Sequence, residues 1–330
     1  MSQTQILKLL LQAQGEYLSG ERLSEALGIT RAAVWKGVEA LRRRGYDIES
    51  KTRRGYRLCA VPDQPDAQAL MEQVQVHTVG RVVRCFETLD STNNYAKQAA
   101  QEGAENGLVV IADQQTGGRG RLGRAFQSPP KRGLYLSALL RPHVLPEQVL
   151  PVTALAAVAA CSAIERACGA QVQIKWTNDL VLGGKKLAGI LTEMGIEGES
   201  GALQYVVVGI GINVNHQRGD FSGDVADMAT SLRMTLGEPV ARSALAAALI
   251  EEMDRLYQAI GGDTSAYLAD YRRRCVTLGR QVRILGSGPE RTGEAVAVDK
   301  NFGLVVRGAD GTLETVRSGE VSVRGLYGYV

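Results

Sequence analysis

The chain has 330 residues, of which 45% are hydrophobic and 22% charged, and its formal net charge is +3. This length allows two or three domains and a sizeable core, and the small net charge excludes a globally basic protein. The charge is nevertheless uneven, because residues 31–57 hold nine Lys or Arg against three acidic residues and net +6, which leaves −3 for the rest. A local basic patch therefore has to be explained.

The cysteines and the apolar segments of the sequence indicate the compartment of the protein. The five cysteines are scattered, odd in number and without a Cys-x-x-Cys pair, which predicts reduced thiols in a cytoplasmic protein. Lys8 interrupts the amphipathic start, so no signal peptide is recognised. The most apolar segment, 149–164, is Ala-rich and shorter than the ~20 residues that span a bilayer. We expect it to be a core helix of a soluble protein that has no membrane partner.

The first sixty residues carry the signals of three short helices. Apolar residues at helical spacing mark 5–11. Ser19 and Thr30 precede two further helical segments, 21–27 and 31–44, and each hydroxyl can accept a hydrogen bond from the free N–H groups of the first turn. Because a glycine separates these two segments, the pattern is that of a helix-turn-helix.

Two short alternating segments, 46–50 and 55–58, follow this motif and are joined by a basic tip. They predict the wing of a winged helix-turn-helix, whose second helix would enter a major groove while the wing contacts phosphates. A helical interaction domain with a solvated charged face is the alternative, but the three signals occur together here. We expect DNA contacts from Thr30, Arg31, Ala32, Ala33, Trp35, Lys36, Arg53 and Arg54.

Residues 61–66 are polar and contain two prolines, which indicates a domain boundary. Beyond it, buried strands alternate with helices. We expect strands at 82–86, 108–112, 134–140, 171–176 and 205–213, and helices at about 92–101, 149–164, 242–260 and 265–273. From residue 279 the pattern changes to five short strands separated by turns, which predicts a small barrel.

A stretch rich in glycine and arginine, 114–126, follows one of the buried strands. Glycines let backbone N–H groups approach an anion, and Arg119, Arg121 and Arg124 repel one another unless a negative group lies among them. We predict that this loop binds phosphate or carboxylate, although a solvated flexible loop would have a similar composition. The spacing also fits a dinucleotide-binding fingerprint, but two prolines follow too soon for the required helix.

A second cationic segment follows the strand at 171–176, where Lys185 and Lys186 come after two glycines. Such a loop suits phosphate contact, although a surface hairpin turn would have the same residues. Asp179 fits a nucleotide or metal contact and equally an ordinary turn. The glycines of 205–213 predict a backbone or a ligand packed closely against that strand.

Four segments together resemble the bifunctional biotin protein ligase and biotin operon repressor family of bacteria. They are the winged helix before residue 60, Asp90-Ser91-Thr92-Asn93, the Gly-Arg-Gly-Arg-Leu-Gly-Arg loop, and Lys175-Trp176-Thr177-Asn178-Asp179 leading to Lys186-Leu187-Ala188-Gly189-Ile190-Leu191. Each segment alone is a modest signal. Their order and spacing along nearly the whole chain are specific.

The resemblance implies an α+β fold in three parts: a winged helix-turn-helix in 1–62, a class II synthetase-like mixed sheet with helices in 66–274, and an SH3-like small barrel in 275–330. It implies a ligase that uses ATP and Mg²⁺ to convert biotin to biotinyl-5'-AMP and transfers biotin to a lysine of the biotin carboxyl carrier protein of acetyl-CoA carboxylase. It also implies a cytoplasmic repressor of biotin synthesis genes, which binds operator DNA as a homodimer with biotinyl-5'-AMP as corepressor.

The resemblance assigns site residues by position. Biotin contacts are expected from Ser91, Thr92, Asn93, Gln115, Arg119, Gly120, Arg121 and Lys186. Arg119, Arg121 and Lys186 are the expected catalytic residues, because their charges would offset the repulsion between a carboxylate and a polyphosphate. ATP contacts are expected from Arg121, Arg124, Phe126, Asn178, Asp179 and Asn213. No metal ligand is assigned, since the three histidines are not spaced as a metal set.

The chain departs from the family pattern at two positions, with Thr177 where proline is usual and Phe126 where tryptophan is common. Phenylalanine keeps an aromatic face but loses the indole donor. Two other functions remain open from the sequence. One is a biotin-sensing repressor without catalysis, and the other is a ligase for lipoate or octanoate, whose relatives lack this arginine loop and usually the DNA-binding module.

Overall fold

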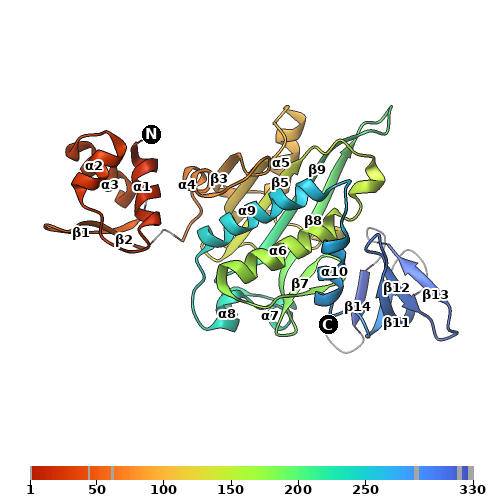
Figure 1. Ribbon diagram of the computed structural model, residues 1–330. Coiled ribbons are helices and arrows are strands. Elements are labelled where there is room, and N and C mark those ends of the chain that lie inside the picture. The colour runs from red at the N-terminus through yellow and green to blue at the C-terminus, as the bar shows by residue number, and fades with distance from the viewer. Residues whose placement is uncertain (1, 44, 61–62, 286–289, 318–321, 326–330) are drawn as a thin grey trace.

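The computed structural model describes residues 2–43, 45–60, 63–285, 290–317 and 322–325. A small helical domain with a hairpin lies on one side, a sheet covered by helices in the middle, and a second, smaller sheet on the other side (Figure 1). Arg44, the last residue of the predicted second helix of the helix-turn-helix, lies outside the described residues, and so do 286–289 and 318–321 among the predicted short strands and turns.

The N-terminal domain is a winged helix-turn-helix, as predicted. It consists of α1 (Ser2–Gln12), α2 (Gly20–Leu27), α3 (Arg31–Arg43), β1 (Asp47–Lys51) and β2 (Gly55–Ala60). Ser19 Oγ accepts a hydrogen bond from Arg22 N at 3.0 Å, and Thr30 Oγ1 accepts one from Ala33 N at 3.2 Å, so both predicted caps form. The domain has a hydrophobic core of its own around α1 and α3.

The central domain is built on a mixed sheet of seven described strands in the order β3-β4-β5-β9-β8-β7-β6. They are β3 (Val82–Leu89), β4 (Leu108–Gln115), β5 (Gly133–Leu140), β6 (Gln173–Lys175), β7 (Asp179–Leu182), β8 (Lys185–Ile196) and β9 (Leu203–Asn213). β3 and β4 are parallel, whereas the other neighbours are antiparallel. The five predicted strands of this domain are confirmed, and β7 and β8 are additional ones.

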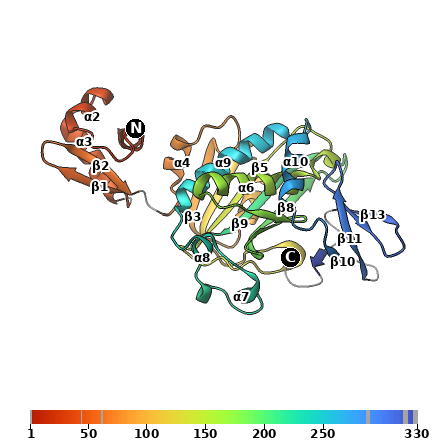
Figure 2. The same cartoon turned by 60° about the horizontal axis from the view of Figure 1, so that its bottom comes forward.

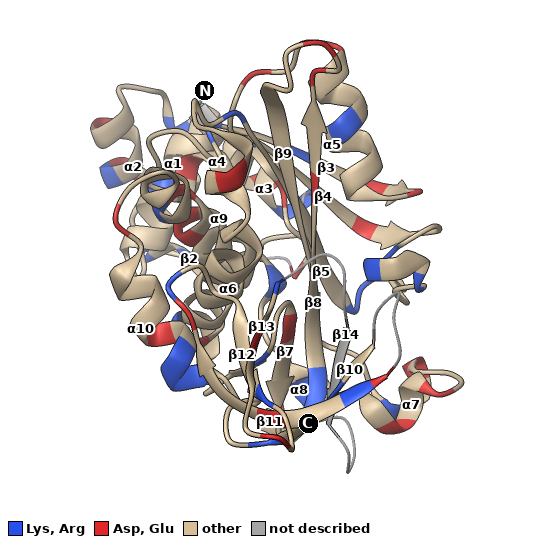
Figure 3. Ribbon diagram, turned by 90° about the vertical axis from the view of Figure 1, so that its right-hand side faces the viewer, with Lys and Arg blue, Asp and Glu red and all other residues tan. Residues whose placement is uncertain are grey.

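The two faces of this sheet have different partners because alternate residues of a strand point to opposite sides. Val206, Val208 and Ile210 of β9 belong to the large core beneath α6 (Val152–Cys168) and α9 (Arg242–Ala259). Val207 belongs instead to a smaller cluster under α5 (Thr92–Gln101). Figure 2 shows α6 and α9 side by side across the sheet. The central strands β5 and β9 carry no charged residue (Figure 3).

Helix α6 corrects part of the sequence argument. By length and composition alone, Pro146–Cys168 is long and apolar enough to cross a membrane, so the expectation that this segment is too short was wrong. However, 67% of its apolar window is buried inside the protein. The segment is a core helix, as expected, because it packs against both α9 and the sheet strands β8 and β9.

The C-terminal part is an antiparallel sheet of five described strands in the order β13-β12-β11-β10-β14. They are β10 (Gln281–Leu285), β11 (Arg291–Val298), β12 (Leu304–Arg307), β13 (Leu313–Val316) and β14 (Ser322–Gly325). This sheet follows α10 (Ser265–Arg274) and contacts the central domain through Trp176, whose indole Nε1 donates to Phe302 O at 2.9 Å. The other described helices are short. They are α4 (Ala67–Gln73), α7 (Val225–Met228), α8 (Leu232–Leu236) and 3-10 turns at Arg121–Gly123, Pro146–Val149 and Arg218–Asp220.

Candidate functional site

One cavity of about 500 Å³ opens on the α5 side of the central sheet. Every residue for which the sequence predicted a biotin or ATP contact lines it. These are Ser91, Thr92, Asn93, Gln115, Arg119, Gly120, Arg121, Arg124, Phe126, Asn178, Asp179, Lys186 and Asn213. They come from the start of α5, the end of β4 and the loop after it, both strands of the β7–β8 hairpin, and the end of β9.

The N-terminus of α5 forms one wall. Ser91, Thr92 and Asn93 are each at most 5% exposed, and Ser91 is the N-cap residue of the helix. Gln115 accepts hydrogen bonds from Thr92 N at 2.9 Å and Thr92 Oγ1 at 3.1 Å. The capping role and the cavity role therefore coexist, and the free N–H groups of a helix start favour a polar or anionic group there.

Asn93 is fixed from several sides. Its amide Nδ2 donates to Glu193 Oε2 at 2.8 Å, and its Oδ1 lies 2.6 Å from the buried hydroxyl of Ser137. A Cβ at position 209 would overlap Asn93 Oδ1, so only glycine fits there. The glycines of β9 were expected to accept a backbone or a ligand, but it is the protein's own side chains that pack on them. Ser137 was missed, although a lone serine in the apolar run 134–140 is a usable signal.

The arginine loop turns its charges toward the cavity to different degrees. Arg121 is half-buried, its Nη1 donates to Asn178 Oδ1 at 3.1 Å, and burial lowers the pKa of its guanidinium. The group stays protonated because an arginine pKa is far above neutral pH. Arg119 is exposed and donates to Asn94 Oδ1, and Arg124 is exposed beside the cavity mouth. The loop is held at the end of β4, as predicted.

Lys186 reaches the cavity from a strand, because the glycine-bearing loop is a hairpin turn. Gly183 and Gly184 have φ values of 58° and 75° and join β7 to β8. The hairpin alternative is therefore correct for this turn, while Lys186 on β8 lines the cavity. Its ammonium Nζ lies 2.7 Å from Asp179 Oδ1, so Asp179 holds the lysine as well as starting β7.

The aromatic ring of Phe126 covers the end of β9. Phe126 packs on Gly211, where an added Cβ would lie 2.6 Å from the ring. Asn213, the last residue of β9, donates from Nδ2 to Thr230 O at 3.1 Å and is 5% exposed. The phenylalanine thus supplies an aromatic wall where the family pattern has tryptophan.

The segment after β9 closes this end of the cavity and contains a buried histidine. Phe221 and Met228 line the cavity, and His216 stacks on Phe221 with ring centroids 5.1 Å apart. His216 is fully buried, which lowers its pKa to about 4, and neither ring nitrogen has a hydrogen-bond partner in the described residues. Sequence reasoning assigned no role to His216, and nothing in its spacing would have revealed this position.

Arg283 was also missed. It lies on β10, far along the chain, yet it lines the same cavity. Its Nε is buried without a hydrogen-bond partner among the described residues. The C-terminal sheet therefore contributes to the wall of the cavity.

Among the described residues, those that line the cavity offer few ligands for a metal ion. Within the described residues, no group of three His, Cys, Asp or Glu is arranged to hold an ion, and Asp179 is the only carboxylate lining the cavity. Mg²⁺ needs few protein ligands when it arrives on the phosphates of a nucleotide. One carboxylate fits that arrangement and does not fit a dedicated protein cage.

The residues expected to contact DNA lie just before α3, on α3 and on the wing, and most of them are exposed. Arg31, Trp35 and Lys36 on α3 are exposed, and Trp35 keeps 54% of its surface accessible. Thr30, Ala32, Arg53 and Arg54 are exposed too, whereas Ala33 is half-buried. The Arg54 guanidinium lies 4.5 Å from the ring centroid of Tyr17, which orders the wing.

The fold and the cavity together define a class of protein: a ligase domain for a small acid, joined to a winged DNA-binding domain. Family models agree with this division. The HTH domain model matches residues 2–57, the biotin/lipoate A/B protein ligase family model matches 85–213, and the biotin protein ligase C terminal domain model matches 277–324.

Named relatives make the assignment specific. The bifunctional ligase/repressor BirA of Escherichia coli is 32% identical over 320 residues, 96% of this chain and 97% of the relative. That of Bacillus subtilis is 40% identical over 238 residues, 72% of this chain and 73% of the relative. The solved biotin protein ligase from Aquifex aeolicus in complex with biotin and ATP has a TM-score of 0.63 and 26% identity, and covers 74% of this chain and 98% of its own. The chain belongs to the family of bifunctional biotin ligases and repressors.

Proposed function

We propose that this protein activates biotin with ATP, transfers it to the biotin carboxyl carrier protein of acetyl-CoA carboxylase, and represses biotin synthesis genes with biotinyl-5'-AMP as corepressor. The observation that carries the enzymatic part is the convergence of the arginine loop, Lys186 and the start of α5 on one cavity. Relatives and solved structures that are named as biotin ligases favour biotin over lipoate as the acid.

The first step joins two anions. A biotin carboxylate oxygen attacks the α-phosphorus of ATP, a carboxyl–phosphate anhydride forms, and pyrophosphate leaves. Arg119, Arg121 and Lys186 are the cavity cations that would offset the repulsion and the charge that develops on the phosphate. The pair Lys186–Asp179 keeps the ammonium group in place before substrates arrive. Biotin would lie against Ser91, Thr92, Asn93, Gln115 and Gly120.

The second step needs no covalent protein nucleophile. The uncharged amine of a carrier lysine attacks the carbonyl carbon of the anhydride, an amide bond forms, AMP leaves and the amine loses its proton. Retention of the adenylate until the carrier arrives requires the cavity to hold both its halves. Arg124, Phe126, Asn178, Asp179 and Asn213 would hold the nucleotide half.

Mg²⁺ would enter with the nucleotide, with Asp179 as the cavity's carboxylate contact. When bound, the ion would neutralise phosphate charge. The protein's own residues would orient the cationic groups. Asn178 Nδ2 donates to Ile190 O at 3.0 Å, which keeps the Asn178 Oδ1 atom directed toward Arg121.

The repressor part rests on the exposed basic surface of α3 and the wing. We propose that α3 enters the major groove of operator DNA, that Arg53 and Arg54 contact phosphates, and that the protein binds there as a homodimer in its adenylate-bound form. We also propose a cytoplasmic location and no membrane partner.

The decisive experiment is intact mass spectrometry under native conditions after the protein is mixed with biotin, ATP and Mg²⁺. We expect a complex with biotinyl-5'-AMP, together with biotin-dependent exchange of labelled pyrophosphate into ATP. Binding of biotin without either signal would support a sensing repressor that has no catalysis. Equal activity with lipoate or octanoate would contradict the choice of acid.

A further inference from the structure

Arg242, the first residue of α9, is a charged side chain in the protein interior. It is 1% exposed, and its guanidinium has carboxylates on two sides. Nε lies 2.6 Å from Asp63 Oδ2, and Nη1 lies 2.6 Å from Asp113 Oδ1. The Asp113 side chain is 9% exposed and that of Asp63 is 46% exposed, so the buried guanidinium has one buried and one exposed counter-charge. Loss of either carboxylate would leave this buried charge with a single carboxylate partner.

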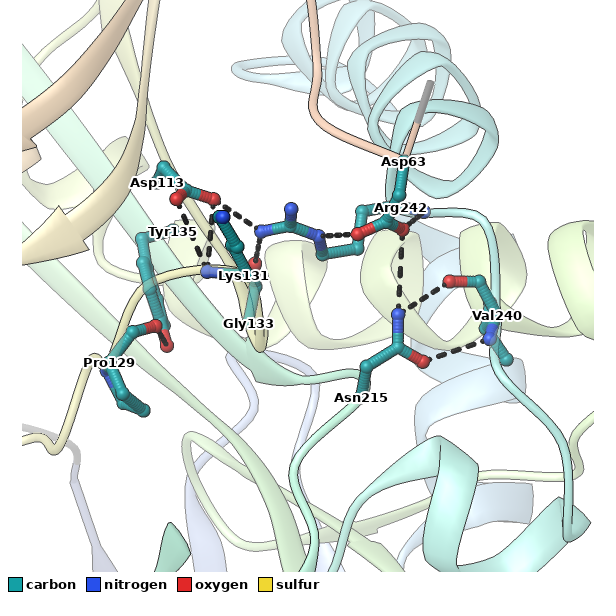
Figure 4. Close-up of polar contacts among 9 residues, drawn as sticks. All are labelled: Asp63, Asp113, Pro129, Lys131, Gly133, Tyr135, Asn215, Val240 and Arg242. Atoms are coloured by element: carbon teal, nitrogen blue, oxygen red, sulfur yellow. Dashed lines mark hydrogen bonds and ion pairs between the residues drawn. The ribbon is translucent and has the colours of Figure 1, made fainter. Parts of the chain in front are cut away.

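One of these partners belongs to the base of the arginine loop. Asp113 lies on β4, two residues before Gln115, and its two oxygens accept hydrogen bonds from Lys131 N at 3.2 Å. Arg242 Nη1 also donates to Gly133 O at 3.2 Å, at the start of β5. Arg242 therefore joins the two ends of the segment 114–132, which carries the arginine loop (Figure 4).

The other partner belongs to the linker. Asp63 lies between the winged domain and α4, and its Oδ1 accepts a hydrogen bond from Arg242 N at 3.1 Å. The same oxygen lies 3.4 Å from Asn215 Nδ2. Asn215 follows the cavity residue Asn213 by two positions and is anchored to Val240 by two hydrogen bonds of 2.9 Å. Figure 4 shows the linker, the loop base and the segment after β9 meeting around Arg242.

We propose that Asp63 is a positioning residue for the ligase cavity: by pairing with Arg242, the linker steadies the base of the arginine loop and slows release of the adenylate. This inference rests on the proposed function. Because coupling between two sites is reciprocal, a bound adenylate must also strengthen the docking of the linker. The contact around Arg242 is then a physical connection between the ligand and the segment that carries the DNA-binding domain.

The test compares two variants of the full-length protein. Asp63→Asn removes the charge that faces Arg242. Asp66→Asn removes the same charge three residues away, at the N-cap of α4, where the side chain accepts from Ala69 N at 2.9 Å. We expect Asp63→Asn to release biotinyl-5'-AMP roughly tenfold faster than wild type, and Asp66→Asn to release it at the wild-type rate. Equal release rates from the two variants would overturn the proposal.

A second measurement does not depend on a variant. Hydrogen exchange of wild type at the backbone amides of 63–73 should slow when biotinyl-5'-AMP binds, and this protection should be lost in Asp63→Asn. If Asp63 had a purely structural role, Asp63→Asn would lower the melting temperature, but the exchange protection at 63–73 would not depend on ligand. Unchanged exchange in wild type would refute the coupling. Failure of wild type to form any adenylate would instead refute the proposed ligase function.

Discussion

Gly211 and Phe126 fit against each other so closely that a Cβ on residue 211 would lie 2.6 Å from the aromatic ring. Gly211 faces the cavity from β9, and Phe126 ends the arginine loop, so the contact sets the position of the loop over the strand. A larger residue would push the ring into the space that we assign to the nucleotide.

We expect Gly211→Ala to raise the KM for ATP roughly tenfold, since overpacking of this kind usually costs 1–3 kcal/mol. Steady-state kinetics of pyrophosphate exchange would measure it. Gly198→Ala is the matched control, because a Cβ at Gly198 meets nothing within 4 Å and its φ is not in the left-handed region. An equal effect in both variants would show that the cause is not the contact with Phe126.

Arg121→Ala should let the adenylate leak into solution. The half-buried guanidinium would otherwise make charge-assisted hydrogen bonds to the phosphate, and their loss corresponds to roughly 10- to 100-fold faster dissociation. Stopped-flow displacement would measure the rate. Arg121→Lys should recover only part of the retention, because an ammonium group lacks the guanidinium fork. An unchanged off-rate in Arg121→Ala would contradict the assignment.

The neighbours Lys185 and Lys186 provide a comparison within one strand. Lys185 is exposed and does not line the cavity, whereas Lys186 does and is paired with Asp179. We expect Lys186→Ala to lower kcat for adenylation roughly 100-fold, the usual effect of removing one preorganised cation or donor. Lys185→Ala should retain wild-type kcat. Similar losses in the two variants would point to net charge in place of a specific contact.

Substitutions on the exposed face of α3 should weaken DNA binding and leave the ligase activity unchanged. Lys36→Ala should reduce the slope of log K against log salt by about 0.9, because one phosphate contact is lost. Trp35→Ala should weaken binding at every salt concentration and leave pyrophosphate exchange unchanged, since its exposed indole does not line the cavity. The probe is a duplex selected from a random library by wild type in the presence of biotin and ATP. A wild-type slope in Lys36→Ala would argue against the predicted orientation of α3.

Stability should fall in mild acid because of His216. Burial lowers the pKa of this side chain from 6.5 to about 4, so the unfolded chain binds a proton before the folded one does. Its contribution to stability is complete above pH 6.5 and decreases as the pH falls to about 4. The loss should be at most about 3 kcal/mol. Urea unfolding at several pH values would measure it: His216→Phe, which keeps the ring stack, should remove this pH dependence, and the exposed His143→Gln should retain it.

The sequence alone was sufficient for most of the helices and strands, and the family resemblance that it carries was sufficient for part of the cavity lining. Helix caps such as Ser19 and Thr30 and the alternation in the strands depend on neighbours within a few residues, so they can be predicted locally. The order of the four motifs is a property of the sequence itself and needs no structure. The sequence did not predict the hairpin of β7 and β8, or that Lys186 lies on one of its strands. The same glycines and lysines suit a hairpin turn and a phosphate-binding loop.

Only the tertiary structure decided which distant residues meet. Arg283 lines the cavity from the C-terminal sheet, and Ser137 supports Asn93 from β5. Arg242 pairs with Asp63 and Asp113, which lie 179 and 129 positions away in the sequence. No local pattern encodes these contacts, because they result from how the strands and helices pack in three dimensions. A buried charge selects its partners by their position in space, and the folded chain alone sets that position.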